Sequence, residues 1–146
     1  MASKYSTGTF IPKNPQKVVG NQRPTWRSSW EMVMMQFLDN HPSVINWSSE
    51  CFKIPYKNPL TGKQTVYIPD FFIVYQDKNG NKRGELIEVK PKKEALMEAA
   101  KSKRDKAFVI LNSAKWQAAM VFCAKNGLHF RVITEEQIFK QNGKKK

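Results

Sequence analysis

The chain has 146 residues and a formal net charge of +13, and 40% of its residues are hydrophobic. This length fits one domain and excludes two independent cores, and the apolar content excludes a wholly disordered chain. The apolar runs, such as Phe71–Tyr75, are too short to cross a membrane, and no apolar segment typical of a secretory signal follows Met1. Two cysteines without metal-ligand spacing predict neither a disulfide framework nor a zinc site, so we expect a reducing intracellular setting.

The N-terminal part of the chain is predicted to form an arm followed by one helix. Residues 1–25 contain three prolines and two glycines without an apolar period, which indicates an extended basic arm. A helix is predicted to begin after Ser28, because Glu31 lies three residues later at the spacing of a capping box. Its apolar stripe is formed by Trp30, Met34, Phe37 and Leu38, and Pro42 lies beyond its end.

Strands are predicted in the middle of the chain. Residues 44–56 are expected to form one or two short strands, and a turn at 58–62 leads into a strand over 64–76. The segment Asp77-Lys78-Asn79-Gly80-Asn81 then predicts a β-hairpin turn. A three-residue loop with Gly80 in the left-handed conformation places Asp70 opposite Glu88. A two-residue Asn-Gly loop pairs Asp70 with Val89 instead and puts the two carboxylates on opposite faces, and the sequence leaves both registers open.

Helices and strands are predicted to alternate after Pro91. We expect a lysine-rich helix over 93–106, a short buried strand over 108–111, a helix capped by Ser113 that ends at Asn126-Gly127, a strand over 129–133 and a short helix from Thr134 to about Phe139. This order predicts an α/β fold with a central mixed β-sheet flanked by helices. The expected organisation is an arm over 1–25, an α/β domain over 26–139 and a disordered basic tail over 140–146.

Two carboxylates and a lysine form the pattern with the clearest chemistry. Strand residues alternate between faces, so Glu88 and Lys90 point to one side, and Asp70 joins them in the first hairpin register. Two carboxylates and the backbone carbonyl of Val89 are oxygen ligands suited to Mg²⁺, for which Mn²⁺ can substitute. Lys90 is then placed to orient or deprotonate a water, and Glu31 completes the site from the helix. Each short motif is also common on solvated strands and turns, where a same-face ion pair has little energetic value.

The positive charge is concentrated in patches, which is typical of a protein that binds nucleic acid. Residues 1–27 carry five basic residues and no acidic ones, and residues 90–106 carry seven basic against three acidic ones. Lysine-rich ends can also serve solubility alone. The residues predicted to contact DNA are Arg23, Trp26, Arg27, Lys92, Lys93, Lys101, Lys103, Arg104 and Lys106.

These motifs resemble the signature of the PD-(D/E)xK nuclease superfamily. Glu31, Pro69-Asp70 and Glu88-Val89-Lys90 match its pattern, and the segments around them are similar to the TnsA-like endonuclease branch. The segments 5–12 and 27–31 are similar to head completion proteins of T4-like tailed phages, a likeness that extends over about residues 5–135. The resemblance implies a restriction-endonuclease-like core, DNA as substrate, and action on packaged DNA ends in the infected host cell or the virion.

The predicted function is therefore a Mg²⁺-dependent DNA endonuclease with little sequence specificity, since no helix-turn-helix or zinc-finger motif is visible. Its expected partners are DNA and phage head or portal proteins, with no membrane and no small-molecule cofactor. The alternative is a head-completion protein that binds DNA or the portal without cutting. A third possibility is a DNA-binding module with a decayed site, although Asp70, Glu88 and Lys90 all retain competent residue types.

Overall fold

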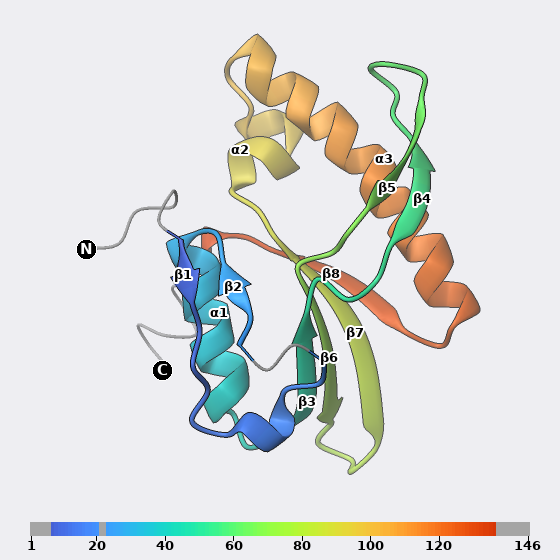
Figure 1. Ribbon diagram of the computed structural model, residues 1–146. Coiled ribbons are helices and arrows are strands. Elements are labelled where there is room, and N and C mark those ends of the chain that lie inside the picture. Colours follow the sequence, from blue (N-terminus) through green and yellow to red (C-terminus); the bar gives the residue numbers. More distant parts are fainter. Residues whose placement is uncertain (1–6, 21–22, 137–146) are drawn as a thin grey trace.

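A four-stranded mixed sheet lies at the centre of the computed structural model, which describes residues 7–20 and 23–136 (Figure 1). The strand order is β3-β6-β7-β8. Strands β3 (Val44–Ser49), β6 (Phe71–Gln76) and β7 (Lys82–Val89) are antiparallel neighbours, and β8 (His129–Ile133) pairs parallel to β7. The predicted α/β class with a central mixed sheet is confirmed.

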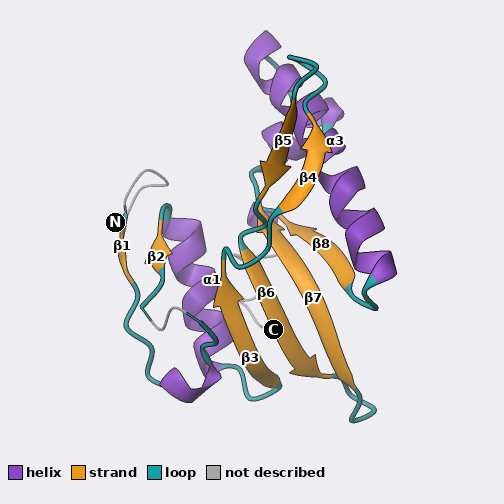
Figure 2. Cartoon of the chain, turned by 45° about the vertical axis from the view of Figure 1, so that its right-hand side comes forward, coloured by secondary structure: helices purple, strands orange, loops and turns teal. Residues whose placement is uncertain are grey.

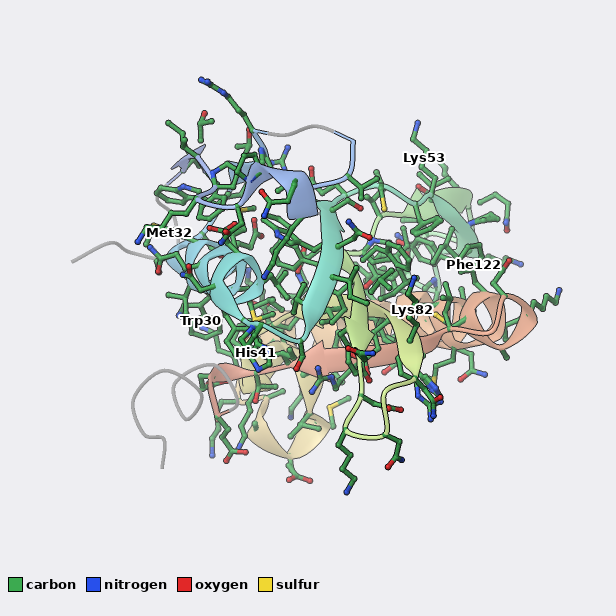
Figure 3. All side chains as sticks on the ribbon, turned by 90° about the horizontal axis from the view of Figure 1, so that it is seen from below. Trp30, Met32, His41, Lys53, Lys82 and Phe122 are labelled. Carbon is green, nitrogen blue, oxygen red and sulfur yellow. The ribbon has the colours of Figure 1, made fainter. Side chains whose placement is uncertain are left out.

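Helices α1 (Ser29–Asn40) and α3 (Lys103–Lys125) cover opposite faces of this sheet (Figure 2). On the α1 face, Met35 and Leu38 pack in one core cluster with Trp47 of β3. On the α3 face, Trp116 packs in a second cluster with Leu86 of β7. The view from below shows Trp30 and Phe122, from the two helices, on opposite sides of the strands (Figure 3). Strands β6, β7 and β8 therefore present alternate residues to two different cores.

The predicted hairpin has the three-residue loop. The β6–β7 ladder runs from Gln76 opposite Lys82 to Phe71 opposite Ile87. The Asp77 N–H donates to the Asn81 carbonyl at 2.8 Å, and Gly80 has φ +84°, a backbone conformation that glycine adopts without strain. This register is the one that places Asp70 and Glu88 at the same end of the hairpin. The ladder itself ends one residue short of that pair.

The prediction of one strand over 64–76 is wrong, because the chain changes sheets at residues 68–70. Strand β5 (Gln64–Tyr67) pairs with β4 (Ile54–Lys57) in a separate hairpin that extends alongside α3, whereas β6 joins the central sheet (Figure 1). Pro69 lies at the break, and proline cannot donate a ladder hydrogen bond. The break frees the backbone and side chain of Asp70 from regular pairing.

The predicted helix over 93–106, strand over 108–111 and cap at Ser113 are also wrong. The structure has a single turn α2 (Lys92–Ala95), a 3₁₀ turn η2 (Met97–Ala99) and then the continuous helix α3. Its cap is Ser102, whose Oγ accepts from the Asp105 N–H at 3.0 Å. The buried positions of α3 recur at intervals of three and four residues, at Val109, Asn112, Trp116, Ala119 and Cys123, and this period outweighs the short apolar run inside it.

Helix α3 is, among the described residues, the one helix long and apolar enough to cross a membrane by length and composition. Core helices of globular domains meet the same criteria. Here Ala119 and Cys123 of α3 are buried against the sheet, which is the packing expected of a core helix.

The described part of the N-terminal segment packs on the domain. Short strands β1 (Gly8–Thr9) and β2 (Thr25–Trp26) pair with each other, a 3₁₀ turn η1 (Pro15–Lys17) lies between them, and Phe10 and Val18 join the α1 core. The buried Asp39 at the end of α1 anchors the segment, because its carboxylate accepts from the Lys13 N–H at 2.8 Å and the Asn14 N–H at 3.0 Å. The predicted helix from Thr134 extends beyond the described residues, and the tail over 140–146 lies outside them.

Candidate active site

Asp70 lies at the junction of three strands. Its Oδ2 accepts a hydrogen bond from the Val89 N–H at the end of β7, at 2.8 Å. Its backbone carbonyl accepts from the Glu50 N–H, just after β3, at 3.0 Å. The side chain and the backbone are therefore both held by neighbouring strands. The fixed carboxylate faces the end of β7, where Glu88 and Lys90 lie.

Glu88 is 4% exposed and makes two different contacts with its two oxygens. The Tyr67 hydroxyl donates to Oε1 at 2.7 Å. The Lys90 Nζ lies 3.6 Å from Oε2, with the lysine side chain 29% exposed. Glu88 and Lys90 thus share one side of β7, as strand alternation predicts, and the lysine reaches from the buried carboxylate toward solvent.

The site concentrates negative charge in a place of low solvent access. Burial raises the pKa of Asp70 well above its ordinary value, and the charges of Glu88 and Glu31 raise it further. Burial also raises the pKa of Glu88, against the opposing effects of Lys90 and of the Tyr67 hydrogen bond. Carboxylates with raised pKa values that face one another are typical of sites that bind a cation or exchange a proton.

Glu31 lies in the first turn of α1, beside a cleft that Lys90 also lines. The Ser28 Oγ accepts from the Glu31 N–H at 3.1 Å, which confirms the predicted cap, and the Glu31 Oε1 accepts from the Arg27 N–H at 2.8 Å. Burial raises the pKa of Glu31, and Lys90 opposes that shift. The cleft has a volume of about 260 Å³ and is lined by Ser28, Trp30, Glu31, Val89, Lys90, Pro91, Lys93, Glu94 and Arg104.

The fit of a divalent ion depends on Asp70 and Glu88. Within residues 7–20 and 23–136, no group of three or more His, Cys, Asp or Glu side chains is arranged to hold a metal ion. Mg²⁺ commonly takes only one or two protein carboxylates and completes its shell with waters and substrate phosphate. The two buried carboxylates therefore fit such an ion. The roles of Glu31 and of the Val89 carbonyl as further ligands stay predictions.

The residues predicted to contact DNA fall into three groups. Lys93 and Arg104 line the cleft beside Lys90. Arg27 pairs with Glu50, and Lys92 pairs with Glu136, so their charges are partly compensated. The others lie apart from the cleft lining: Lys101, Lys103 and Lys106 are exposed around the start of α3, Arg23 is exposed, and Trp26 is half-buried against the α1 core.

Three residues near the site were not predicted from the sequence. Tyr67 binds Glu88, the charge of Glu50 raises the pKa of Glu31, and Lys115 of α3 lies over the Tyr67 ring at 5.7 Å from its centroid. Tyr67 precedes Asp70 by three residues. In the continuous strand that the sequence predicted, these two side chains would lie on opposite faces of the sheet. No sequence pattern pointed to Lys115 as a site residue, because its helix was predicted to begin at Ser113 and in fact begins at Lys103.

Comparison with known proteins places the chain in a family. The family model of the TnsA-like endonuclease N-terminal domain matches residues 41–135, a range that contains Asp70, Glu88 and Lys90. The head completion nuclease of Enterobacteria phage T4 is 35% identical in a match that covers 89% of this chain and 91% of the phage T4 protein. The chain therefore belongs to the TnsA-like endonuclease family.

Proposed function

We propose that this protein is a Mg²⁺-dependent DNA nuclease of the PD-(D/E)xK type that acts on packaged DNA ends during phage head completion. The observation that carries the proposal is the meeting of Asp70 and Glu88 at the end of β7, with the Lys90 Nζ, which lines the cleft, 3.6 Å from Glu88. The phage T4 relative is named as a head completion nuclease, which supports both the chemistry and the biological setting.

Asp70, Glu88 and the Val89 carbonyl are the groups that would hold the metal ion, with Glu31 beside them. When bound, Mg²⁺ supplies charge neutralisation at the phosphate and lowers the pKa of a coordinated water. The chain prepares this site by burying the carboxylates and by fixing their orientations through the Val89 N–H and the Tyr67 hydroxyl. Mn²⁺ is expected to replace Mg²⁺ because it accepts the same oxygen ligands.

Lys90 is the residue proposed to act on the attacking water. Its ammonium group lies between the buried Glu88 carboxylate and the open cleft, where a phosphodiester would enter. In the hydrolysis, the water oxygen forms a bond to phosphorus and the P–O ester bond breaks. The proton lost by the water passes to solvent, and the released oxygen takes up a proton from solvent. Lys90 orients the water and offsets the charge of the phosphate.

DNA is proposed to lie along the cleft from Lys90 past Lys93 and Arg104. These cations belong to the part of the chain with the largest internal excess of positive charge. Contacts of this kind recognise phosphates and do not distinguish bases, so we expect little sequence specificity. Phage head or portal proteins are the proposed protein partners, on the basis of the name of the phage T4 relative.

Plasmid cleavage with matched variants tests the function. Wild-type protein should cut supercoiled plasmid DNA with Mg²⁺ or Mn²⁺ and stop cutting in EDTA, and Glu88→Gln should be inactive. Glu85→Gln is the control, because Glu85 is also a buried carboxylate of β7 but pairs with Arg131 away from the cleft. Binding of DNA by the wild type without cleavage in either metal would overturn the proposal and favour a non-catalytic head-completion protein.

The Lys90→Ala variant distinguishes a role in DNA cleavage from a purely structural role in head assembly. We expect it to abolish cleavage while DNA affinity stays near the wild-type value, because one phosphate contact among several is lost. A phage that carries this variant should produce filled but poorly infectious heads. Normal infectivity with the variant incorporated would contradict a catalytic role in head completion.

A further inference from the structure

Lys115 lies on α3, which packs against the sheet on the face opposite α1 and near β7, the strand that carries Glu88. Its neighbour Trp116 is buried in the core cluster that contains Leu86 of β7. Packing of Trp116 against the sheet fixes the position of the helix and brings Lys115 to the end of β7. The side chain of Lys115 is half-buried, so it is neither a fully solvated surface lysine nor sealed in the core.

The ammonium group of Lys115 is linked to the site through Tyr67. The Lys115 Nζ lies 5.7 Å from the centroid of the Tyr67 ring, within the range of a cation–π contact. The hydroxyl of the same tyrosine donates to Glu88 Oε1 at 2.7 Å. Lys90, in contrast, approaches Glu88 through Oε2. One buried carboxylate therefore has Lys90 in direct contact and Lys115 near it, on the far side of the Tyr67 ring contact.

The electrostatic environment agrees with this geometry. Burial and the charge of Lys90 lower the pKa of Lys115, and the charges of Glu88 and Asp70 partly oppose this shift. Lys115 therefore interacts with both carboxylates and with the second lysine. Holding two ammonium groups close together is unfavourable unless anionic groups lie between them, and a DNA phosphate adds such a charge.

We propose that Lys115 is a second active-site lysine, which binds a non-bridging oxygen of the DNA phosphodiester at the reacting centre. It stabilises the negative charge that grows on the phosphate during hydrolysis and takes no part in proton transfer. Its role differs from that of Lys90, which orients the water. This inference rests on the proposed nuclease function and names a residue of the same site.

The alternative is a packing role, in which the aliphatic stem of Lys115 covers Tyr67 and its charge balances Glu88. Lys115→Met distinguishes the two, because methionine keeps an unbranched apolar stem and removes the charge. Lys115→Arg keeps the charge with a different shape. Lys125→Met is the matched control, since Lys125 is an exposed lysine in the last turn of the same helix and its loss changes the net charge equally.

The experiment measures single-turnover cleavage at saturating DNA, DNA affinity in EDTA and the melting temperature. We expect Lys115→Met to lower the cleavage rate by about 10²-fold, as for loss of one transition-state donor, with an unchanged melting temperature and nearly unchanged affinity. Lys115→Arg should recover part of the rate, and Lys125→Met should cleave like the wild type. If Lys115→Met is unstable, Lys115→Gln is measured against the same expectation.

Cleavage by folded Lys115→Met at the rate of Lys125→Met would overturn the inference, and so would a rate loss accompanied by an equal loss of DNA affinity. Lys90→Ala keeps this outcome separate from the proposed function. If the wild type cuts, Lys90→Ala does not and Lys115→Met does, only the role of Lys115 fails. If the wild type does not cut at all, the nuclease function fails, and the role of Lys115 fails with it.

Discussion

Asp39 and Asp70 show two different ways of withdrawing a carboxylate from solvent. Asp39 is 1% exposed, and both of its oxygens accept backbone N–H groups from the N-terminal segment. Asp70 accepts one backbone N–H from Val89, and its pKa is raised by burial and by the nearby carboxylates of Glu88 and Glu31. The charge of Asp39 is therefore compensated by hydrogen-bond donors of the protein itself. The charge of Asp70 has fewer such donors and is suited to compensation by a bound ligand, which is typical of a functional site.

Asp70→Asn should have the largest effect on activity. Loss of the charge removes a proposed metal ligand while the shape is nearly kept, so we expect cleavage to fall by about 10³-fold or more, equivalent to about 4 kcal/mol of transition-state stabilisation. The melting temperature should stay the same or rise, because a buried charge near other carboxylates is removed. Single-turnover cleavage and calorimetry measure the two effects. A large fall in stability would mean that Asp70 serves the fold, as Asp39 does.

Asp39→Asn should show the reverse behaviour. The asparagine side chain has only one oxygen, so its NH₂ group would face one of the two backbone N–H groups and leave it without an acceptor. This should lower the free energy of unfolding by about 2–3 kcal/mol. We expect the melting temperature to fall by about 5–10 °C, with cleavage by the folded protein unchanged. Lys17 and Asn14, which donate to carbonyls at the end of α1, are expected to hold part of the segment in place. Loss of cleavage without loss of stability would contradict this assignment.

Tyr67→Phe should have an intermediate effect, on activity more than on stability. Removing the hydroxyl frees Glu88 Oε1 and leaves the ring in place, so metal affinity and cleavage should each fall by about 10–100-fold. Tyr56→Phe is the control, because Tyr56 lies in the same core cluster on the partner strand β4. Equal activity of the two variants would show that the Tyr67 hydroxyl does not position Glu88.

The basic residues show the same difference between charges that the protein itself compensates and charges that are available to a ligand, here DNA. Lys93 and Arg104 line the cleft, whereas Lys92 pairs with Glu136. Replacing both Lys93 and Arg104 by Gln should flatten the dependence of log K on log salt by about 2, and Lys92→Gln should change it by much less than 1. Fluorescence anisotropy with duplex DNA at a series of salt concentrations gives the slopes. An equal change per charge in both variants would rule out a special role for the cleft.

The smallest expected effect is on the pH dependence of stability. A carboxyl group whose pKa is raised in the folded state holds its proton more tightly there, so the folded protein loses stability as pH rises from the ordinary pKa through the raised one. Without metal, the melting temperature of the wild type should fall relative to that of Asp70→Asn by about 2–4 °C across this range. If the difference in melting temperature between the two proteins does not change with pH, the pKa of Asp70 is not raised in the folded state.

The sequence predicted those parts of the site that depend on local geometry. The hairpin turn at Gly80 and the Ser28 cap of the helix that carries Glu31 were predicted, whereas the register that places Asp70 and Glu88 at one end was one of two that the sequence left open. The residues missed by the sequence depend on tertiary contacts. Asp39 binds backbone groups 25 and 26 residues away, and Lys115 reaches Tyr67 only because α3 is continuous through an apolar run that is ambiguous between strand and helix.

The sheet change at Pro69 has a similar origin. The β-branched and aromatic residues of 64–76 fit one strand, and only pairing with two different partners, β4 and β3, divides it. Proline marks a weak point in a strand but does not say where the next residues go. The result is that Asp70 falls at a break, where its carboxylate is held by Val89.

Titration of the metal-free protein with Mn²⁺ by calorimetry tests the central claim, that Asp70 and Glu88 together form a cation-binding site. We predict saturable binding to the wild type and to Glu85→Gln, weakening of at least about tenfold in Asp70→Asn and in Glu88→Gln, and a rise in melting temperature only for the proteins that bind. Equal Mn²⁺ binding by all four proteins, or binding by none of them, would contradict the account.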